Sequence, residues 1–143
     1  FDLRGVAISK EGTKLFTVNT NSNYIFRWNL STAFDITSIG SSPDQTVAIG
    51  GTQPYSDVQL SPDDKYIIYR QGNHSNLYYQ REFSSSNPLS LSHTSAVTNG
   101  FKSFSSSGPG SANVDPLGAC FLNDGNSMFV FDRQNNQIDK YTT

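Results

Sequence analysis

The chain has 143 residues, of which 35% are hydrophobic and 15% charged, against about 45–50% and about 25% in an average globular domain. Ten basic and 12 acidic residues give a net charge of −2, so the chain has no overall electrostatic attraction to nucleic acid or to an anionic membrane surface. No apolar run approaches the roughly 20 residues that span a bilayer. The aromatic content (10 Phe, 7 Tyr and 1 Trp) favours one β-rich domain over residues 1–143 rather than a disordered segment.

Three segments repeat along the chain, and each begins with a short predicted strand and a tight turn. The predicted first strands are Val6–Ser9, Val58–Ser61 and Ala119–Leu122. The turns that follow place Gly or Asp where a hairpin commonly needs a positive φ. The predicted second strands are the near-continuous apolar runs Lys14–Val18, Tyr66–Arg70 and Ser127–Phe131. Such runs are typical of strands that are covered on both faces.

Each segment continues into a third predicted strand after an Asn- and Gly-rich turn. These third strands align at Tyr24–Trp28, Asn76–Gln80 and Gln137–Tyr141. Fourth strands are predicted at Thr46–Ile49 and Gly100–Phe104, whereas the third segment reaches Thr143 before any fourth strand. The units therefore cover about residues 1–52, 53–115 and 116–143. Since no stretch of ten or more residues shows a capped helical period, the sequence predicts an all-β chain.

Tandem four-stranded units of this length are typical of β-propeller blades, so we predict three blades, of which the last is incomplete. Natural proteins avoid exposed sheet ends, so we expect the blades to close by self-association or to belong to a longer propeller. Residues 139–143 followed by residues 1–3 of a neighbour resemble residues 28–36, which favours a ring of copies; a fragment cut at a repeat boundary predicts the same. The start at Phe1, without a leader, is interpreted as that of a mature piece or a fragment.

The first unit resembles a more particular group of repeats. Residues 5–16 (GVAISKEGTKLF) and 25–37 (IFRWNLSTAFDIT) are similar to the "SPDGTKLYV…LST-aromatic-Asp-Ile-Thr/Ser" repeats of propeller-like proteins, among them predicted bacteriophage tail and other virion-associated proteins. The most specific part is Leu30–Thr37, and unit two has the looser Phe83–Leu89. The resemblance implies a virion, extracellular or cell-surface location and a structural or recognition role. The single cysteine, Cys120, forms no intramolecular disulfide and leaves the compartment open.

We therefore expect a non-enzymatic module, without catalytic residues or cofactor, that assembles through its blades and presents polar loops to a glycan or a protein. Tyr78 and Tyr79, beside Asn73 and His74 in an Asn- and Gly-rich loop, are the candidate sugar platform because sugars stack on aromatic rings. Packing of these rings between blades is the alternative interpretation. Neither nucleic acid nor membrane is expected as a partner.

The alternative function is a metal-dependent hydrolase of the lactonase-like propeller kind. Asp57 and Asp115 fall at or just before predicted innermost strands, which line the channel of a propeller, and carboxylate oxygens are ligands for hard cations. His74 and His93 lack acidic or cysteine neighbours at ligand spacing and are interpreted as solvated loop residues. Cys120 is interpreted as a small core residue, and Asp35 is expected to form an Asx-type turn.

Overall fold

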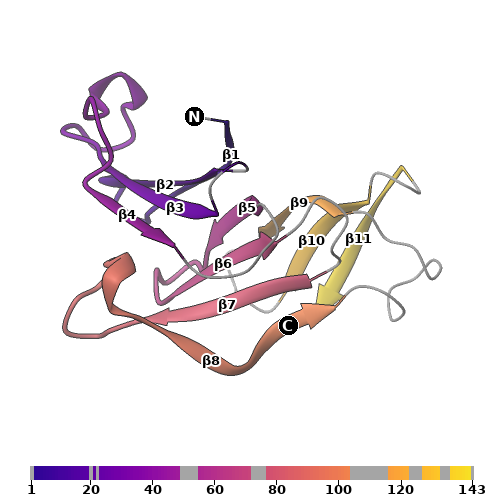
Figure 1. Ribbon diagram of the computed structural model, residues 1–143. Helices are drawn as coiled ribbons and strands as arrows, with labels where there is room; N and C mark the ends of the chain where they lie inside the picture. Colours follow the sequence, from indigo (N-terminus) through magenta and orange to yellow (C-terminus); the bar gives the residue numbers. More distant parts are fainter. Residues whose placement is uncertain are drawn as a thin grey trace.

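The computed structural model describes residues 2–19, 21, 23–48, 55–71, 77–103, 116–122, 127–132 and 136–142, whose strands form three antiparallel sheets (Figure 1). We call them blades 1, 2 and 3. Blade 1 contains β1 (Leu3–Ile8), β2 (Lys14–Asn19), β3 (Tyr24–Asn29) and β4 (Gln45–Ala48). Blade 2 contains β5 (Tyr55–Leu60), β6 (Tyr66–Gln71), β7 (Leu77–Phe83) and β8 (Thr94–Ser103). Blade 3 contains β9 (Pro116–Phe121), β10 (Ser127–Asp132) and β11 (Gln137–Thr142).

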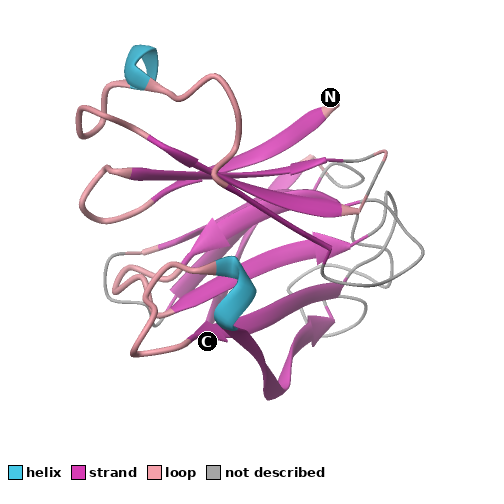
Figure 2. Cartoon of the chain, turned by 60° about the vertical axis from the view of Figure 1, so that its left-hand side comes forward, coloured by secondary structure: helices cyan, strands magenta, loops and turns pink. Residues whose placement is uncertain are grey.

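The all-β prediction is confirmed, and every predicted first, second and third strand overlaps an observed strand. Helical structure in the described residues is limited to two short 3-10 turns, η1 (Ile36–Ser38) and η2 (Leu91–His93), which are cyan in Figure 2. No helix among these residues is long and apolar enough to cross a membrane. The outer strand of blade 2 begins six residues before its predicted start at Gly100, because Thr94, Val97 and Thr98 supply β-branched residues within a Ser-rich stretch.

The alignment of the third strand in unit two is wrong by one residue. Paired residues lie nine apart in blade 1 (Thr17 and Phe26) and in blade 3 (Val130 and Asp139), but ten apart in blade 2 (Tyr69 and Tyr79). The connection before β7 is therefore one residue longer than its counterparts. Because successive strand residues point to opposite faces, this shift places Tyr79 rather than Tyr78 on the sheet face that corresponds to Phe26 of blade 1.

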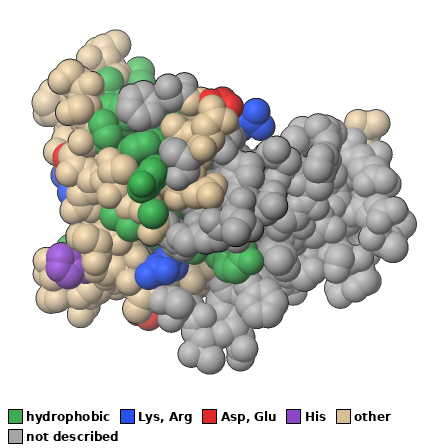
Figure 3. Space-filling view, in the orientation of Figure 1, with side chains coloured by type: hydrophobic (Ala, Val, Ile, Leu, Met, Phe, Trp, Pro, Cys, Tyr) green, Lys and Arg blue, Asp and Glu red, His purple; other side chains and the backbone are tan. Residues whose placement is uncertain are grey.

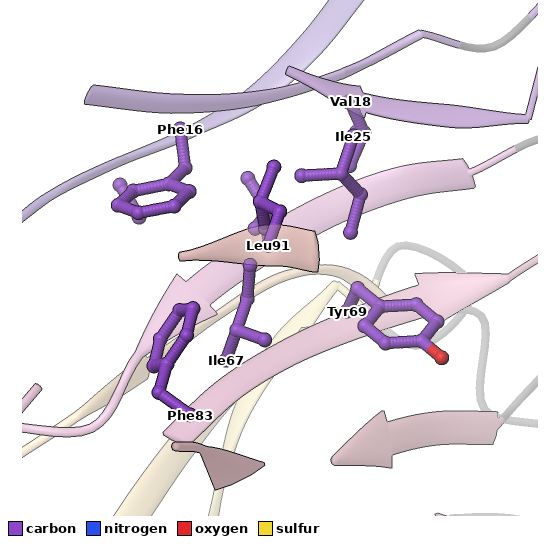
Figure 4. Packing of buried hydrophobic residues seen from close by; sticks show 9 residues of the cluster. Phe16, Val18, Ile25, Ile67, Tyr69, Phe83 and Leu91 are labelled. Carbon is purple, nitrogen blue, oxygen red and sulfur yellow. The ribbon is translucent and has the colours of Figure 1, made fainter. Parts of the chain in front are cut away.

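The largest hydrophobic cluster fills the seam between blades 1 and 2. Its buried members come from the facing sides of both sheets and from η2: Ala7, Phe16, Val18, Ile25, Val58, Ile67, Tyr69, Phe83 and Leu91. Figure 4 shows the side chains of the two sheets pointing toward one another. The ring centroids of Phe16 and Phe83 are 6.0 Å apart. Residues from β1, β2 and β3 thus share one core with residues from blade 2, so the two sheets form a single packed unit.

Polar contacts tie the same two blades together around this core. The backbone N–H of Lys10 donates to Oδ2 of Asp64 at 2.8 Å, which joins the first hairpin turns of the two blades. Nη1 of Arg27 donates to the carbonyl oxygen of Leu89 at 2.7 Å. The side chain of Gln45 accepts from the N–H of Leu91 at 2.8 Å. The seam is therefore fixed at its inner, middle and outer parts.

A second cluster fills the seam between blades 2 and 3. Its buried members are Ile68 and Tyr78 from blade 2 and Ala119, Met128, Val130 and Tyr141 from blade 3. Blade 2 is therefore covered on both faces, as its apolar second strand predicts. The inner strands β1, β5 and β9 pack side by side, with β5 in the middle (Figure 1).

The inner strands approach most closely at Gly5. This residue lies at a β-bulge in β1 and has φ +60°. A Cβ atom placed on Gly5 would lie 2.8 Å from the backbone nitrogen of Val58 and 2.9 Å from Cα of Asp57. Only glycine allows both the left-handed conformation and this contact between the backbones of two blades.

The connection between the third and fourth strands has the same backbone design in blades 1 and 2. The residues that precede the 3-10 caps, Phe34 and Leu89, both have φ +59°. Asp35 caps η1 by accepting from the N–H of Thr37 at 2.9 Å, so the Asx-type turn is confirmed. In both blades an N–H after the third strand bonds the last residue of the turn: Ser31 to Ser38, and Ser84 to His93. The Leu30–Thr37 element therefore has a structural counterpart in blade 2.

Candidate functional site

The candidate site is built around the buried carboxylate of Asp57. Asp57 lies on β5, the inner strand of the middle blade, and its residue is only 4% exposed. It pairs with Arg70 on β6, and Arg70 pairs in turn with Tyr78 on β7. Residues that oppose one another across antiparallel strands project to the same face, so these three polar side chains share the face of blade 2 that meets blade 3.

Both carboxylate oxygens of Asp57 accept hydrogen bonds from the protein. Oδ1 accepts from the N–H of Val58 at 2.9 Å and from Nε2 of Gln59 at 3.3 Å. Oδ2 accepts from the hydroxyl of Tyr78 at 3.0 Å and from the N–H of Ala119, on the inner strand of blade 3, at 3.1 Å. A carboxylate offers about four lone-pair positions, so these four donors use its capacity. Asp57 thereby links two blades at the centre of the fold.

Burial and hydrogen bonding act on this group in opposite directions. Burial raises the pKa of Asp57 above its ordinary value, while the hydrogen bonds from Tyr78, Gln59, Ala119 and Val58 oppose the rise. Burial also raises the pKa of the Tyr78 phenol, and the neighbouring charge of Asp57 raises it further. Tyr78 therefore stays protonated and serves as the donor in its bond to Asp57.

Two of the predicted binding residues lie on opposite faces of blade 2. Tyr78 is 2% exposed and packs in the seam with blade 3, so its ring presents no face to a surface glycan. Tyr79 is half-buried, packs against the cluster shared with blade 1, and stacks on Tyr69 at 5.7 Å with an interplanar angle of 17°. The alternative interpretation, packing between blades, describes both rings. Asn73 and His74, the other two predicted binding residues, lie outside the described residues.

The predicted metal pair is represented by Asp57 alone, since Asp115 lies outside the described residues. Among the residues that the structure describes, no three His, Cys, Asp or Glu side chains gather in a group that could hold a metal ion. A cation at Asp57 would have to displace donors that already fill the carboxylate. Asp57 therefore has the surroundings of a hydrogen-bonded link between two blades.

Three further assignments can be compared with the structure. Cys120 was expected in the core, but its side chain is exposed, because it points to the face of blade 3 that lies away from blade 2. Asp63 accepts from the N–H of Lys65 within its turn, as expected of a turn carboxylate. Nδ1 of His93 lies 3.0 Å from Oγ of Ser90, at the end of η2.

The sequence analysis missed other buried polar residues of blades 2 and 3, among them Arg70, which shares a sheet face with Asp57. Arg70 is 1% exposed at the end of the apolar second strand, and its charge lowers the pKa of Tyr78 against the effect of burial. A charged residue that closes an otherwise apolar run was the available signal for a buried polar network.

Asp139 is a second buried carboxylate, and Gln137 donates to both of its oxygens at 3.0 and 3.1 Å.

No protein-family model and no curated protein matches the chain. Several solved structures do resemble its fold. A protein from Lactobacillus plantarum aligns with a TM-score of 0.69 and 13% identity over 99% of this chain and 37% of its own. A Bacteroides fragilis protein provisionally assigned as a 6-phosphogluconolactonase gives a TM-score of 0.68 and 15% identity over 98% of this chain and 34% of its own. The β-propeller domain of Cps50 (Swd1) from Myceliophteria thermophila gives 0.60 and 8% over 98% and 39%.

The chain spans 34–39% of the length of these three proteins, so each is more than twice as long. TM-scores of 0.60–0.69 establish a shared fold, whereas identities of 8–15% carry no information about activity. The three described sheets, stacked with their inner strands side by side, agree with this likeness over nearly the whole chain. The predicted fold is confirmed: the sheets are blades of a β-propeller.

Proposed function

We propose that the chain is a non-enzymatic structural and recognition module, a propeller segment of a phage tail or another virion-associated protein that binds a glycan or a protein on a host surface. The observation that carries the non-enzymatic part is the saturation of Asp57. The carboxylate of Asp57, on the inner strand of blade 2, is bound by four donors from its own and the next blade. Such a group stabilises the contact between blades and has no lone pair left for a reacting group.

The virion part of the proposal rests on the resemblance of Leu30–Thr37 to phage-type repeats. The structure supplies this element with a defined backbone, which blade 2 repeats with a different sequence. Recognition falls to exposed hydroxyl-rich segments, because Tyr78 and Tyr79 pack between blades. Exposed serine and threonine residues follow the third strand in both complete blades: Ser31, Thr32, Ser41, Ser42, Ser85 and Ser86. Hydroxyl groups both donate and accept hydrogen bonds, as recognition of a polar partner requires.

The first test separates this module from a metal-dependent hydrolase. We expect the melting temperature of the chain to be the same in excess Ca²⁺ and in excess chelator, since Asp57 has no free ligand position. A resident metal would raise the melting temperature by mass action, by an amount that grows with the ratio of its concentration to its Kd. Differential scanning fluorimetry across a Ca²⁺ titration makes the measurement, with Asp63→Asn as the control for an exposed turn carboxylate.

A Ca²⁺-dependent rise in the wild-type chain that persists in Asp63→Asn and disappears in Asp57→Asn would contradict the proposal and favour the hydrolase. Hydrolysis of a simple δ-lactone by the Ca²⁺-loaded chain would contradict it in the same way. The recognition part is tested by a glycan array and by capture of host envelope proteins on the immobilised chain. We expect selective binding by the wild-type chain and equal binding by Tyr78→Phe, because the Tyr78 ring is buried. The absence of binding in both assays would contradict the recognition role.

A further inference from the structure

Among the described residues, blade 1 and blade 3 each have one sheet face that no other blade covers. On blade 1 this face carries Val6, which is 57% exposed, at the position where blade 2 has the fully buried Val58. The equivalence follows from strand register, since Val6 pairs with Thr17 as Val58 pairs with Tyr69. A position that is buried against the preceding blade in blade 2 is thus open in blade 1.

The outer loop of blade 1 repeats this contrast. Ile36, the first residue of η1, is 55% exposed, whereas Leu91, the first residue of η2, is 1% exposed and lies in the core shared with blade 1. Phe34 and Leu89 share the same positive φ, but Phe34 is exposed while Leu89 packs against that core. We call Val6, Ile8, Phe34 and Ile36 the receiving face. Figure 3 shows exposed apolar side chains (green) gathered over blade 1.

Blade 3 shows the complementary pattern on its free face. Phe131 and Ile138 are 42% and 68% exposed, and they pair across β10 and β11 as Val18 and Ile25 pair across β2 and β3. Val18 and Ile25 are fully buried against blade 2. Cys120 is exposed at the position of the buried Ala7. We call Cys120, Phe131, Ile138 and Lys140 the inserting face.

Two polar details extend this equivalence. Lys140 is exposed and pairs with Phe129 as Arg27 pairs with Phe16, and Arg27 is the residue that donates to a backbone carbonyl of the next blade. Gly118 has open space on the side where a Cβ would lie, whereas its aligned counterpart Gly5 touches the backbone of the next inner strand. The inserting face therefore has the apolar, cationic and backbone features of the blade 1 face that packs against blade 2.

We propose that the inserting face of one chain docks on the receiving face of a second copy, so that two copies close a six-bladed ring through two equivalent seams. The argument is continuity with the seam between blades 1 and 2, whose two sides are repeated by the two free faces of the same chain. In this arrangement Lys140 approaches the backbone carbonyl of Phe34 in the second copy, as Arg27 approaches that of Leu89. Head-to-tail contacts of this kind close into rings, and six blades lie within the usual range of about 4–8. This proposal is independent of the proposed recognition function.

The test begins with the molar mass of the full chain, measured by light scattering after size exclusion at micromolar concentration. We expect twice 15.7 kDa for the wild type. Ile138→Asp and Ile36→Asp each place a buried charge in the proposed seam, so each is expected to halve the mass. Ser85→Asp adds the same charge to an exposed loop of the middle blade and is expected to leave the dimer intact.

A mixing experiment distinguishes this head-to-tail contact from a face that pairs with its own copy. Ile138→Asp keeps an intact receiving face, and Ile36→Asp keeps an intact inserting face. An equimolar mixture is therefore expected to recover the dimer mass through one seam, although neither variant dimerises alone. A dimer that only one of the two substitutions disrupts would overturn the proposal.

The single cysteine provides a measurement that needs no substitution. Cys120 lies on the inserting face, so its alkylation by iodoacetamide is expected to slow as the wild-type concentration rises. Ile36→Asp, which keeps Cys120 and the inserting face unchanged, is expected to react at one rate at all concentrations. A wild-type chain that has the monomer mass and a concentration-independent alkylation rate would overturn the proposal and assign both faces to further blades of a longer chain.

Discussion

Replacement of Gly5 with alanine is expected to lower the free energy of unfolding by about 2–5 kcal/mol. A left-handed backbone costs a residue with a Cβ about 1–2 kcal/mol, and overpacking of a filled interior adds about 1–3 kcal/mol. The new Cβ would lie 2.8 Å from the backbone nitrogen of Val58, and a backbone cannot rotate away as a side chain does. Since the contact joins the inner strands of two blades, relief requires the seam between blades 1 and 2 to widen.

Gly40→Ala is the matched control for this substitution. A Cβ on Gly40 would meet its nearest neighbour, the carbonyl oxygen of Ser42, at 3.5 Å, which is an ordinary contact. We expect the control to change the free energy of unfolding by less than about 0.5 kcal/mol. Urea denaturation followed by tryptophan fluorescence measures both, since Trp28 lies in blade 1. Equal stability of the two variants would mean that the approach of β1 to β5 is looser than the structure shows.

Replacement of Asp57 with alanine is expected to lower the free energy of unfolding by about 2–6 kcal/mol, because each buried donor left without its acceptor costs about 1–3 kcal/mol. The change leaves the hydroxyl of Tyr78 and the N–H of Ala119 without the acceptor that they share. Denaturant unfolding measures the loss. Asp63→Ala, in an exposed turn, is the control and is expected to cost less than half as much.

The two seams are expected to respond differently to this change. Asp57→Ala removes the hydrogen bond that blade 3 donates to blade 2 but leaves the apolar cluster between blades 1 and 2 unchanged. Limited proteolysis should therefore cut blade 3 first in Asp57→Ala, whereas Gly5→Ala should expose blade 1. A uniform loss of protection in both variants would show that the three blades unfold as one cooperative unit.

The pH dependence of stability should separate the charge of Asp57 from its hydrogen bonds. Because burial raises the pKa of Asp57 in the folded chain above the ordinary value of 3.8, the folded chain binds this proton more tightly than the unfolded chain. The stability that comes from this group is therefore fully present below pH 3.8 and is lost as the pH rises through the raised pKa. Asp57→Asn cannot titrate, so the free-energy gap between wild type and variant should narrow as the pH rises. Urea midpoints across the acidic range measure this gap, and a gap that widens would mean that the four hydrogen bonds outweigh burial.

The strands could be predicted because each blade repeats the same local rules. Gly12 and Asp64 occupy aligned turn positions with positive φ, and the second strands are apolar because two sheets cover them. The register of β7 could not be predicted, because the extra residue lies in a connection that carries no hydrophobic pattern. That single residue decided which of Tyr78 and Tyr79 faces which blade.

The candidate site was predictable in its position but not in its role. Asp57 was recognised as a carboxylate on an innermost strand, and the structure places it there. Its role depends on the N–H of Ala119, which is 62 residues away in the chain and comes close only when blade 3 packs on blade 2. Sequence patterns within one strand carry no information about a donor that comes from another blade. The exposure of Cys120 was missed for a related reason, since its surroundings depend on a neighbouring blade rather than on its own strand.

The bond from Ala119 to Asp57 also gives the molecule a built-in reporter of its internal motion. Most strand amides exchange their hydrogen with solvent when the ladder of their own sheet opens, but the buried amide of Ala119 has its acceptor in another blade. Its hydrogen exchange therefore follows the separation of blades 2 and 3 rather than the fraying of β9. The exchange rate of the Ala119 amide can be compared with the rates of amides at the centre of β6. A faster rate at Ala119 would mean that blades 2 and 3 separate as intact sheets before either sheet unfolds.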